Sequence, residues 1–271
     1  MNTISTFLFD FDGTMRACYG ATGFHKWADP YAIKQVFDVD VSPDELIKYA
    51  GLAYPQLIRS ITAHALRCEP ESISEADILT YGNLFREIEV GLLRQKPDSN
   101  SLREGILAFI HEAGELGLNR GIVSNNNKYN IDPVLNQFRI RHCFGIIADE
   151  DAVAVHHRKP NPEHWLVAAR HLEVDPSACV AIDDTKVGID AAAAAGMVTV
   201  WCPETEFSPE ECPSTYNIRM PTDGPFSMAF LRTELNALGY ELHPPKSVQL
   251  RRLIATTLQT HFTNSLTPAF A

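Results

Sequence analysis

The chain has 271 residues, 45% of them hydrophobic and 21% charged, which is typical of a globular protein with one large domain or two modest ones. Its 34 acidic residues outnumber its 23 basic ones, which gives a formal net charge of −11. This balance argues against nucleic acid or an anionic membrane as a partner, because both require a basic face.

The amino terminus and the cysteines predict the compartment. The first residues contain no basic region followed by a long apolar run, and no segment reaches the roughly 20 apolar residues that a membrane span needs. The six cysteines have neither zinc-ligand spacing nor a C-x-x-C pair, so we expect reduced, mostly buried thiols. These features together predict a cytoplasmic protein.

Five short apolar runs predict the buried strands of an α/β fold. They cover residues 6–11, 121–124, 144–148, 179–182 and 198–201. Helical patterns between or beside the later runs cover residues 102–116, 163–172 and 187–195. Alternation of this kind is typical of a parallel sheet with helices on both faces, so we expect a three-layer Rossmann-like core.

The segment between residues 16 and 97 departs from this alternation. Its pattern is helical throughout, with predicted helix starts after Ser42 and at Ser74. An insertion of about 80 residues is too long for a simple loop. We therefore expect a core of residues 1–15 and 98–203 that is interrupted by a helical domain of residues 16–97.

Residues 204–271 form an extension of different character. Five prolines between residues 203 and 225 indicate an extended connector, and helical patterns follow near 227–238 and 247–262. Covering the core, forming a homodimer contact and binding a partner all remain open as roles for this extension.

The first candidate site is the pair Asp10 and Asp12, which comes directly after an apolar run. Residues at i and i+2 of an extended chain point to the same side, and the carboxyl end of a parallel strand faces the ligand crevice of α/β proteins. Gly13 allows a sharp turn immediately afterwards. A lone D-x-D pair also occurs in solvated turns, so its meaning depends on the sites that accompany it.

Three further polar sites occur later in the chain. Ser124 and Asn125 end the second predicted strand, where a hydroxyl and nearby backbone N–H groups can hold an anionic oxygen. Lys159 stands at the start of a proline-rich turn that restricts its backbone. Asp183 and Asp184 follow another strand, and adjacent buried carboxylates are costly unless a cation compensates them. A metal ion is therefore the natural completion of this pair.

The order of these four sites resembles the haloacid dehalogenase superfamily of phosphohydrolases. The segments that carry the resemblance are FLFDFDGT, GIVSNN, RKPNPE and AIDDTKVGIDAAAAAGM. The last is similar to a block of the branch that contains phosphoglycolate phosphatases and β-phosphoglucomutases, and that branch places a helical cap after its first motif. The resemblance covers about residues 4–203 and implies the superfamily's α/β core with an inserted helical cap.

The resemblance also implies roles for these residues. Asp10 would be the nucleophile that forms an aspartyl-phosphate, and Asp12 would be the general acid and base. Attack of a carboxylate on a phosphate needs counter-charge, because two unit charges at 4 Å repel by about 4 kcal/mol at an effective dielectric of 20. Lys159 would supply part of that charge, and Ser124, with Asn125 beside it, would bind the phosphoryl group.

A magnesium ion would supply the remaining counter-charge. The resemblance implies that Asp10, Asp184 and the backbone carbonyl of Asp12 bind Mg²⁺, with Asp183 as a further ligand or neighbour. The carboxylate at Asp12 favours phosphate esters over halides, because a halide leaving group needs no proton. The expected function is thus a Mg²⁺-dependent phosphatase that acts on a small phosphorylated metabolite.

The predicted cap would select the substrate. A loop at residues 48–51 could reach over the site, where a cationic Lys48 would suit an acidic or phosphorylated substrate; the alternative is an ordinary exposed lysine. His25 could also touch substrate. Two alternative functions remain open, namely a phosphomutase, and a protein that mainly binds a partner through its carboxyl-terminal extension.

Overall fold

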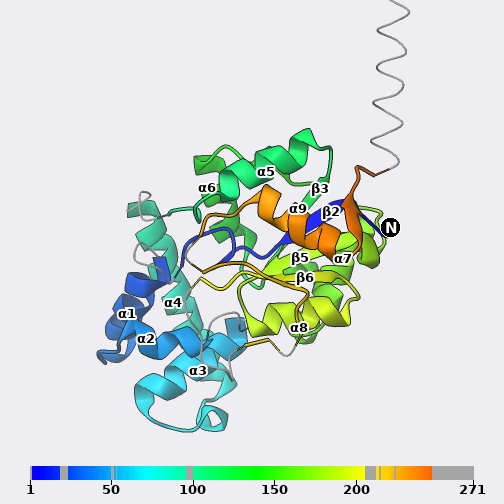
Figure 1. Ribbon diagram of the computed structural model, residues 1–271. Coiled ribbons are helices and arrows are strands. Elements are labelled where there is room, and N and C mark those ends of the chain that lie inside the picture. The colour runs from blue at the N-terminus through cyan, green and yellow to red at the C-terminus, as the bar shows by residue number, and fades with distance from the viewer. Residues whose placement is uncertain are drawn as a thin grey trace, which may run out of the picture.

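The computed structural model describes residues 2–18, 24–49, 52, 54–95, 100–204, 212–213, 215–222 and 224–245. Its centre is a sheet of six parallel strands in the order β4-β3-β2-β5-β6-β7 (Figure 1). These strands are β2 (Thr6–Phe9), β3 (Asn119–Val123), β4 (Ile146–Ala148), β5 (Cys179–Asp183), β6 (Val198–Trp201) and β7 (Ile218–Arg219). All five predicted strands are therefore confirmed, with shifts of one or two residues at their ends.

Helices cover both faces of this sheet and complete three layers. One face carries α5 (Ile106–Glu115), α6 (Lys128–Gln137) and α9 (Met228–Ala237), and the other carries α7 (Glu163–His171) and α8 (Lys186–Ala194). On the first face Phe109 of α5 packs edge-on against Phe7 and Phe9 of β2, with ring centroids 5.2 and 5.8 Å apart. On the second face Trp165 packs with the alanines of α8. The three-layer α/β prediction is confirmed.

A group of helices lies between β2 and the rest of the sheet in sequence and to one side of it in space (Figure 1). It contains α1 (Phe24–Phe37), α2 (Pro43–Leu46), α3 (Tyr54–Leu66) and α4 (Glu75–Gln95), and we call residues 24–95 the helical insert. The insert has a buried apolar cluster of its own, which includes Ile33, Ile58 and Phe85. Ser42 and Ser74 each accept a backbone hydrogen bond at a helix start, as predicted.

The chain beyond residue 203 adds two short strands and a helix to the core. Strand β7 extends the sheet beside β6, while β8 (Tyr240–Leu242) pairs in parallel with β1 (Asn2–Ile4). Ser227 caps α9, which packs against α5. The sequence pattern missed these strands because runs of two or three residues are too short to show a period. The helix predicted at 247–262 lies outside the described residues.

The helix predicted from residue 102 begins at Ile106, because Gly105 adopts a left-handed conformation with φ of +79° and Leu102 instead bridges to Arg16.

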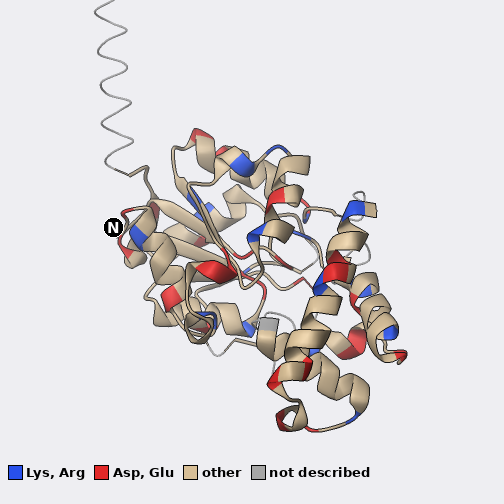
Figure 2. Cartoon of the chain, turned by 180° about the vertical axis from the view of Figure 1, so that it is seen from behind, with Lys and Arg blue, Asp and Glu red and all other residues tan. Residues whose placement is uncertain are grey.

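All six cysteines are free thiols and four are buried, as expected. Figure 2 shows acidic and basic segments interspersed over the sheet region and the helical insert. Among the described helices, none combines the length and the apolar character that crossing a bilayer requires.

Candidate active site

The four predicted sites meet at the carboxyl edge of the central strands. Asp10 follows β2, Ser124 follows β3 and Asp183 ends β5, and these three strands are neighbours in the sheet. The Nζ of Lys159 reaches into this edge and lies 2.7 Å from Asp10 Oδ1 and 2.8 Å from Asp183 Oδ2. It also donates to the backbone carbonyl of Val123 at 2.7 Å. Residues separated by up to 173 positions thus form one hydrogen-bonded cluster, as the sequence predicts.

Lys159 is a fixed cation in this cluster. Its ammonium is buried and lies 4.5 Å from the centre of the Trp165 ring. Burial alone would lower the pKa of Lys159, but the carboxylates of Asp10 and Asp183 outweigh burial and raise it. The side chain therefore stays charged and is held between the carboxylates of Asp10 and Asp183.

The acidic residues around Lys159 carry more charge than it can balance. Oxygen atoms of Asp10, Asp183 and Asp184 all lie within 4.8 Å of one another, and all three residues are buried. Burial raises the pKa of Asp10 and of Asp184 well above the usual value, and the neighbouring Asp183 adds to the rise in both. Three buried carboxyl groups with one contacting lysine are costly to ionise together without a further cation, and hard oxygen donors of this kind fit Mg²⁺.

The carboxylates differ in how free they are to bind a metal. Both oxygens of Asp183 are already occupied, since one accepts from Lys159 and the other from the backbone and hydroxyl of Thr185 at 2.8 and 2.7 Å. Asp184 accepts one hydrogen bond from Thr14 at 3.0 Å. The side chain of Asp12 lies outside this trio and groups instead with Cys18 and His25. Asp10 and Asp184 are therefore the carboxylates best placed to bind a metal directly.

The carboxylate of Asp12 is held by two residues that the sequence analysis missed. Arg16 Nε donates to Oδ1 at 2.7 Å, and Asn126 Nδ2 donates to Oδ2 at 2.6 Å. Burial acts to raise the pKa of Asp12, but the charges of Arg16 and His25 prevail and lower it. Arg16 is itself only 1% exposed. Its four-residue spacing from Asp12 was the one available sequence signal, and that spacing is informative in helices rather than in a turn such as this one.

Gly13 gives a direct test of how Asp184 is positioned. Its φ is +80°, and a Cβ there would lie 2.1 Å from Asp184 Oδ2. We expect Gly13→Ala to displace this carboxylate and to weaken Mg²⁺ binding at least about tenfold, measured by calorimetry, besides a stability loss of about 1–2 kcal/mol for a left-handed alanine. Gly196→Ala is the matched control, because its φ is +78° and the space around it is open. Unchanged Mg²⁺ affinity in Gly13→Ala would contradict this role of Asp184.

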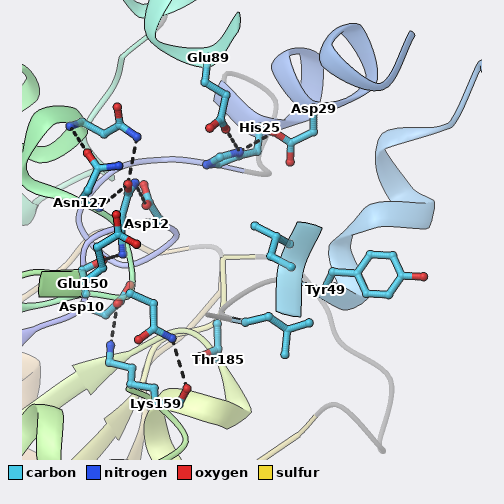
Figure 3. A pocket seen from close by; sticks show the side chains of 16 residues that line it. Asp10, Asp12, His25, Asp29, Tyr49, Glu89, Asn127, Glu150, Lys159 and Thr185 are labelled. Carbon is cyan, nitrogen blue, oxygen red and sulfur yellow. Dashed lines mark hydrogen bonds and ion pairs between the residues drawn. The ribbon is translucent and has the colours of Figure 1, made fainter. Parts of the chain in front are cut away.

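A pocket lies between the sheet edge and the helical insert (Figure 3). The core contributes Asp10, Asp12, Ser124, Asn125 and Lys159 to its lining, among others. The insert contributes His25, Asp29, Tyr49, Leu52, Leu57 and Glu89. A ligand in this pocket would contact the predicted catalytic residues on one side and helices α1 and α4 on the other.

The structure places Lys48 outside the pocket lining, in agreement with the alternative of an ordinary exposed lysine. Lys48 is exposed in a short 3₁₀ turn, does not line the pocket, and places its Nζ 5.0 Å from the ring of its neighbour Tyr49. Tyr49 lines the pocket instead, because successive residues of such a tight turn point in different directions. Ala50 and Gly51 of the predicted loop lie outside the described residues. His25 does line the pocket, as considered from the sequence.

Comparisons with known proteins agree with this geometry. A family model described as haloacid dehalogenase-like hydrolase matches residues 4–196. Protein CbbY of Cupriavidus necator is 36% identical over 107 residues, which cover 38% of this chain and 41% of that protein. Hexitol phosphatase B of Escherichia coli K12 is 31% identical over 109 residues, or 40% of this chain and 48% of that protein. The chain thus spans about half the length of the curated relatives it matches.

A solved structure extends the likeness over the whole fold. β-Phosphoglucomutase from Clostridium difficile superposes with a TM-score of 0.68 and covers 87% of this chain and 98% of its own. The two sequences are 23% identical, so this similarity shows a shared fold.

Proposed function

Because the chain belongs to the haloacid dehalogenase-like hydrolases, we propose that it is a Mg²⁺-dependent phosphatase that hydrolyses the phosphomonoester of a small metabolite through an aspartyl-phosphate. The observation that carries this proposal is the buried contact of 2.7 Å between Asp10 and Lys159 in a pocket that Asp12 also lines. Asp10 would be the carboxylate nucleophile, Lys159 would be the cation that binds the phosphate, and Asp12 would be the second carboxyl group, which transfers protons. Residues 16–97 are proposed to act as the cap domain over this site.

The proposed reaction has two steps. In the first, an oxygen of Asp10 attacks phosphorus, the bond from phosphorus to the substrate oxygen breaks, and Asp12 donates a proton to that oxygen. This step uses the protonated form of Asp12, which is the minor form because the pKa of Asp12 is lowered. In the second, Asp12 takes a proton from water, which attacks the aspartyl-phosphate and releases phosphate and free Asp10. Lys159 compensates the charge of the phosphoryl group in both steps, and Ser124 donates a hydrogen bond to it.

Mg²⁺, bound by Asp10, Asp184 and the backbone carbonyl of Asp12, would supply Lewis-acid stabilisation of the phosphoryl oxygens. Similarity to hexitol phosphatase B supports a phosphatase and a small phosphorylated substrate for this chain. A cytoplasmic location and a homodimer stay predictions.

Metal removal tests the proposed function. We expect the protein to release phosphate from at least one member of a panel of phosphorylated metabolites, and chelation of divalent ions to lower that rate at least about 100-fold, because the site then keeps its uncompensated carboxylates. Added Mg²⁺ should restore the rate, and circular dichroism should show an unchanged fold throughout. A rate that chelation leaves intact would contradict the metal dependence. A folded protein that releases phosphate from no substrate would favour the binding-protein alternative.

A further inference from the structure

The pocket wall opposite the nucleophile is acidic. Among the described lining residues, Lys159 is the one lysine or arginine, and it is already paired with Asp10 and Asp183. Asp29 of α1 and Glu89 of α4 stand with His25 on the far side of the pocket from Lys159 (Figure 3). A substrate whose phosphate is bound at Lys159 would extend its alcohol part toward this wall.

Glu89 shares its nearby cationic groups, His25 and Arg16, with the carboxylates of Asp29 and Asp12. It is 8% exposed, and its nearest cationic partner is His25, whose Nδ1 lies 3.7 Å away. The same ring nitrogen makes a closer contact of 2.7 Å with Asp29, so one imidazole serves two carboxylates. Burial raises the pKa of Glu89 to about 7, although His25 acts in the opposite direction. A hydrogen-bond donor or a cationic group from a ligand would favour the ionised form of Glu89 and so bind to its oxygens.

The amide side of the pocket contains a buried acceptor without a partner among the described residues. Asn130 donates from Nδ2 to Asn126 Oδ1 at 3.0 Å, and Asn126 in turn donates to Asp12. One N–H of each amide is thus used within the protein. Asn130 Oδ1 is buried and accepts no hydrogen bond from the residues that the structure describes, although Asn130 lines the pocket. A buried acceptor without a partner is costly, and a hydroxyl or ammonium group of a ligand would relieve that cost.

We propose that this pocket selects monophosphates whose alcohol part bears hydroxyl or ammonium groups and no second anionic group. The proposal rests on the phosphatase function proposed above and specifies its substrate class. Donor groups on the alcohol would bind Glu89 and Asn130, whereas a second phosphate or a carboxylate would face carboxylates across the pocket. A phosphomutase cycle needs a sugar bisphosphate in the same pocket, so the wall also favours hydrolysis over that alternative.

Two pairs of substrates that differ in a single group test this selectivity. Sorbitol 6-phosphate and 6-phosphogluconate share a six-carbon chain and differ at C1, which is an alcohol in one and a carboxylate in the other. Glycerol 3-phosphate and 3-phosphoglycerate form the equivalent three-carbon pair. We expect kcat/KM for the neutral member to exceed that for the acid at least about 100-fold, because the acid lacks the donor and adds a like charge. Equal or better turnover of the acid in either pair would overturn the proposal.

Substitutions at Glu89 test whether this wall causes the preference. Glu89→Lys should reduce the ratio of kcat/KM between the neutral and acidic members at least about tenfold, and Glu89→Gln should shift it in the same direction with less change in shape. Glu87→Lys is the control, because Glu87 lies on the same helix but is exposed and outside the pocket lining. Unchanged ratios in both Glu89 variants would overturn the assignment of selectivity to this wall.

Binding measurements distinguish a failure of this inference from a failure of the proposed function. If the wild-type protein releases phosphate from none of the four compounds, their binding to the Asp10→Asn variant is measured by calorimetry. Tighter binding of the neutral members would support the selectivity even though the phosphatase proposal had failed. Tighter or equal binding of the acids would overturn it.

Discussion

Replacing Asp10 by asparagine is expected to lower kcat at least about ten-thousandfold while the protein stays folded, because an amide cannot form the aspartyl-phosphate. The fold should survive, since Lys159 keeps its contact with Asp183 at 2.8 Å after the change. Removal of a buried carboxylate with a raised pKa also relieves its repulsion with Asp183. Phosphate release on the preferred substrate measures kcat, and thermal denaturation measures the fold.

A matched control separates this effect from the loss of an aspartate in general. Asp40→Asn removes an exposed carboxylate of the helical insert, whose partner is Lys34, and should leave kcat within about twofold of wild type. Mass spectrometry of acid-quenched wild-type protein should show a phosphoryl group on Asp10. Activity of Asp10→Asn above about one per cent of wild type would exclude Asp10 as the nucleophile.

Replacing Lys159 by methionine is expected to affect stability and activity together. Asp10 and Asp183 would lose their shared cation and stay buried, which typically costs about 3–5 kcal/mol in the free energy of unfolding. The phosphate would also lose its fixed positive charge, so kcat/KM should fall at least about 100-fold. Urea denaturation and steady-state kinetics measure the two effects.

Added Mg²⁺ and a surface substitution provide two further measurements on the role of Lys159. Mg²⁺ should return part of the stability that Lys159→Met loses, because a cation bound at Asp10 and Asp184 replaces some of the missing charge. Lys186→Met breaks the pair with Asp190 on the surface of α8, at 2.8 Å, and should change stability by about 0.5 kcal/mol or less. Equal losses in the two variants would refute the idea that Lys159 stabilises the buried cluster.

Local sequence patterns were sufficient to predict most of the α/β core and the polar residues at the carboxyl edge of its sheet. Buried parallel strands are apolar through their whole length, so the polar residue that ends each one marks the edge of the sheet. Asp10, Ser124 and Asp183 stand at such transitions, and adjacent parallel strands must bring them together. Lys159 was assigned to the same site from its sequence motif, and the structure places its ammonium between two of the predicted carboxylates.

The tertiary structure alone decided which residues surround these predicted ones. Arg16 contacts Asp12 through a turn of the chain. Glu89 lines the same pocket from α4, although it is nearly 80 positions away from Asp10 in sequence. The sequence analysis chose Lys48 as the cap residue at the site, whereas the structure places Tyr49 there and leaves Lys48 exposed. A local pattern shows which face of an element is apolar, but the contacts between distant elements depend on how those elements pack. The grouping of polar residues at the sheet edge was therefore predictable from the sequence, whereas the acidic wall of the pocket was decided by packing.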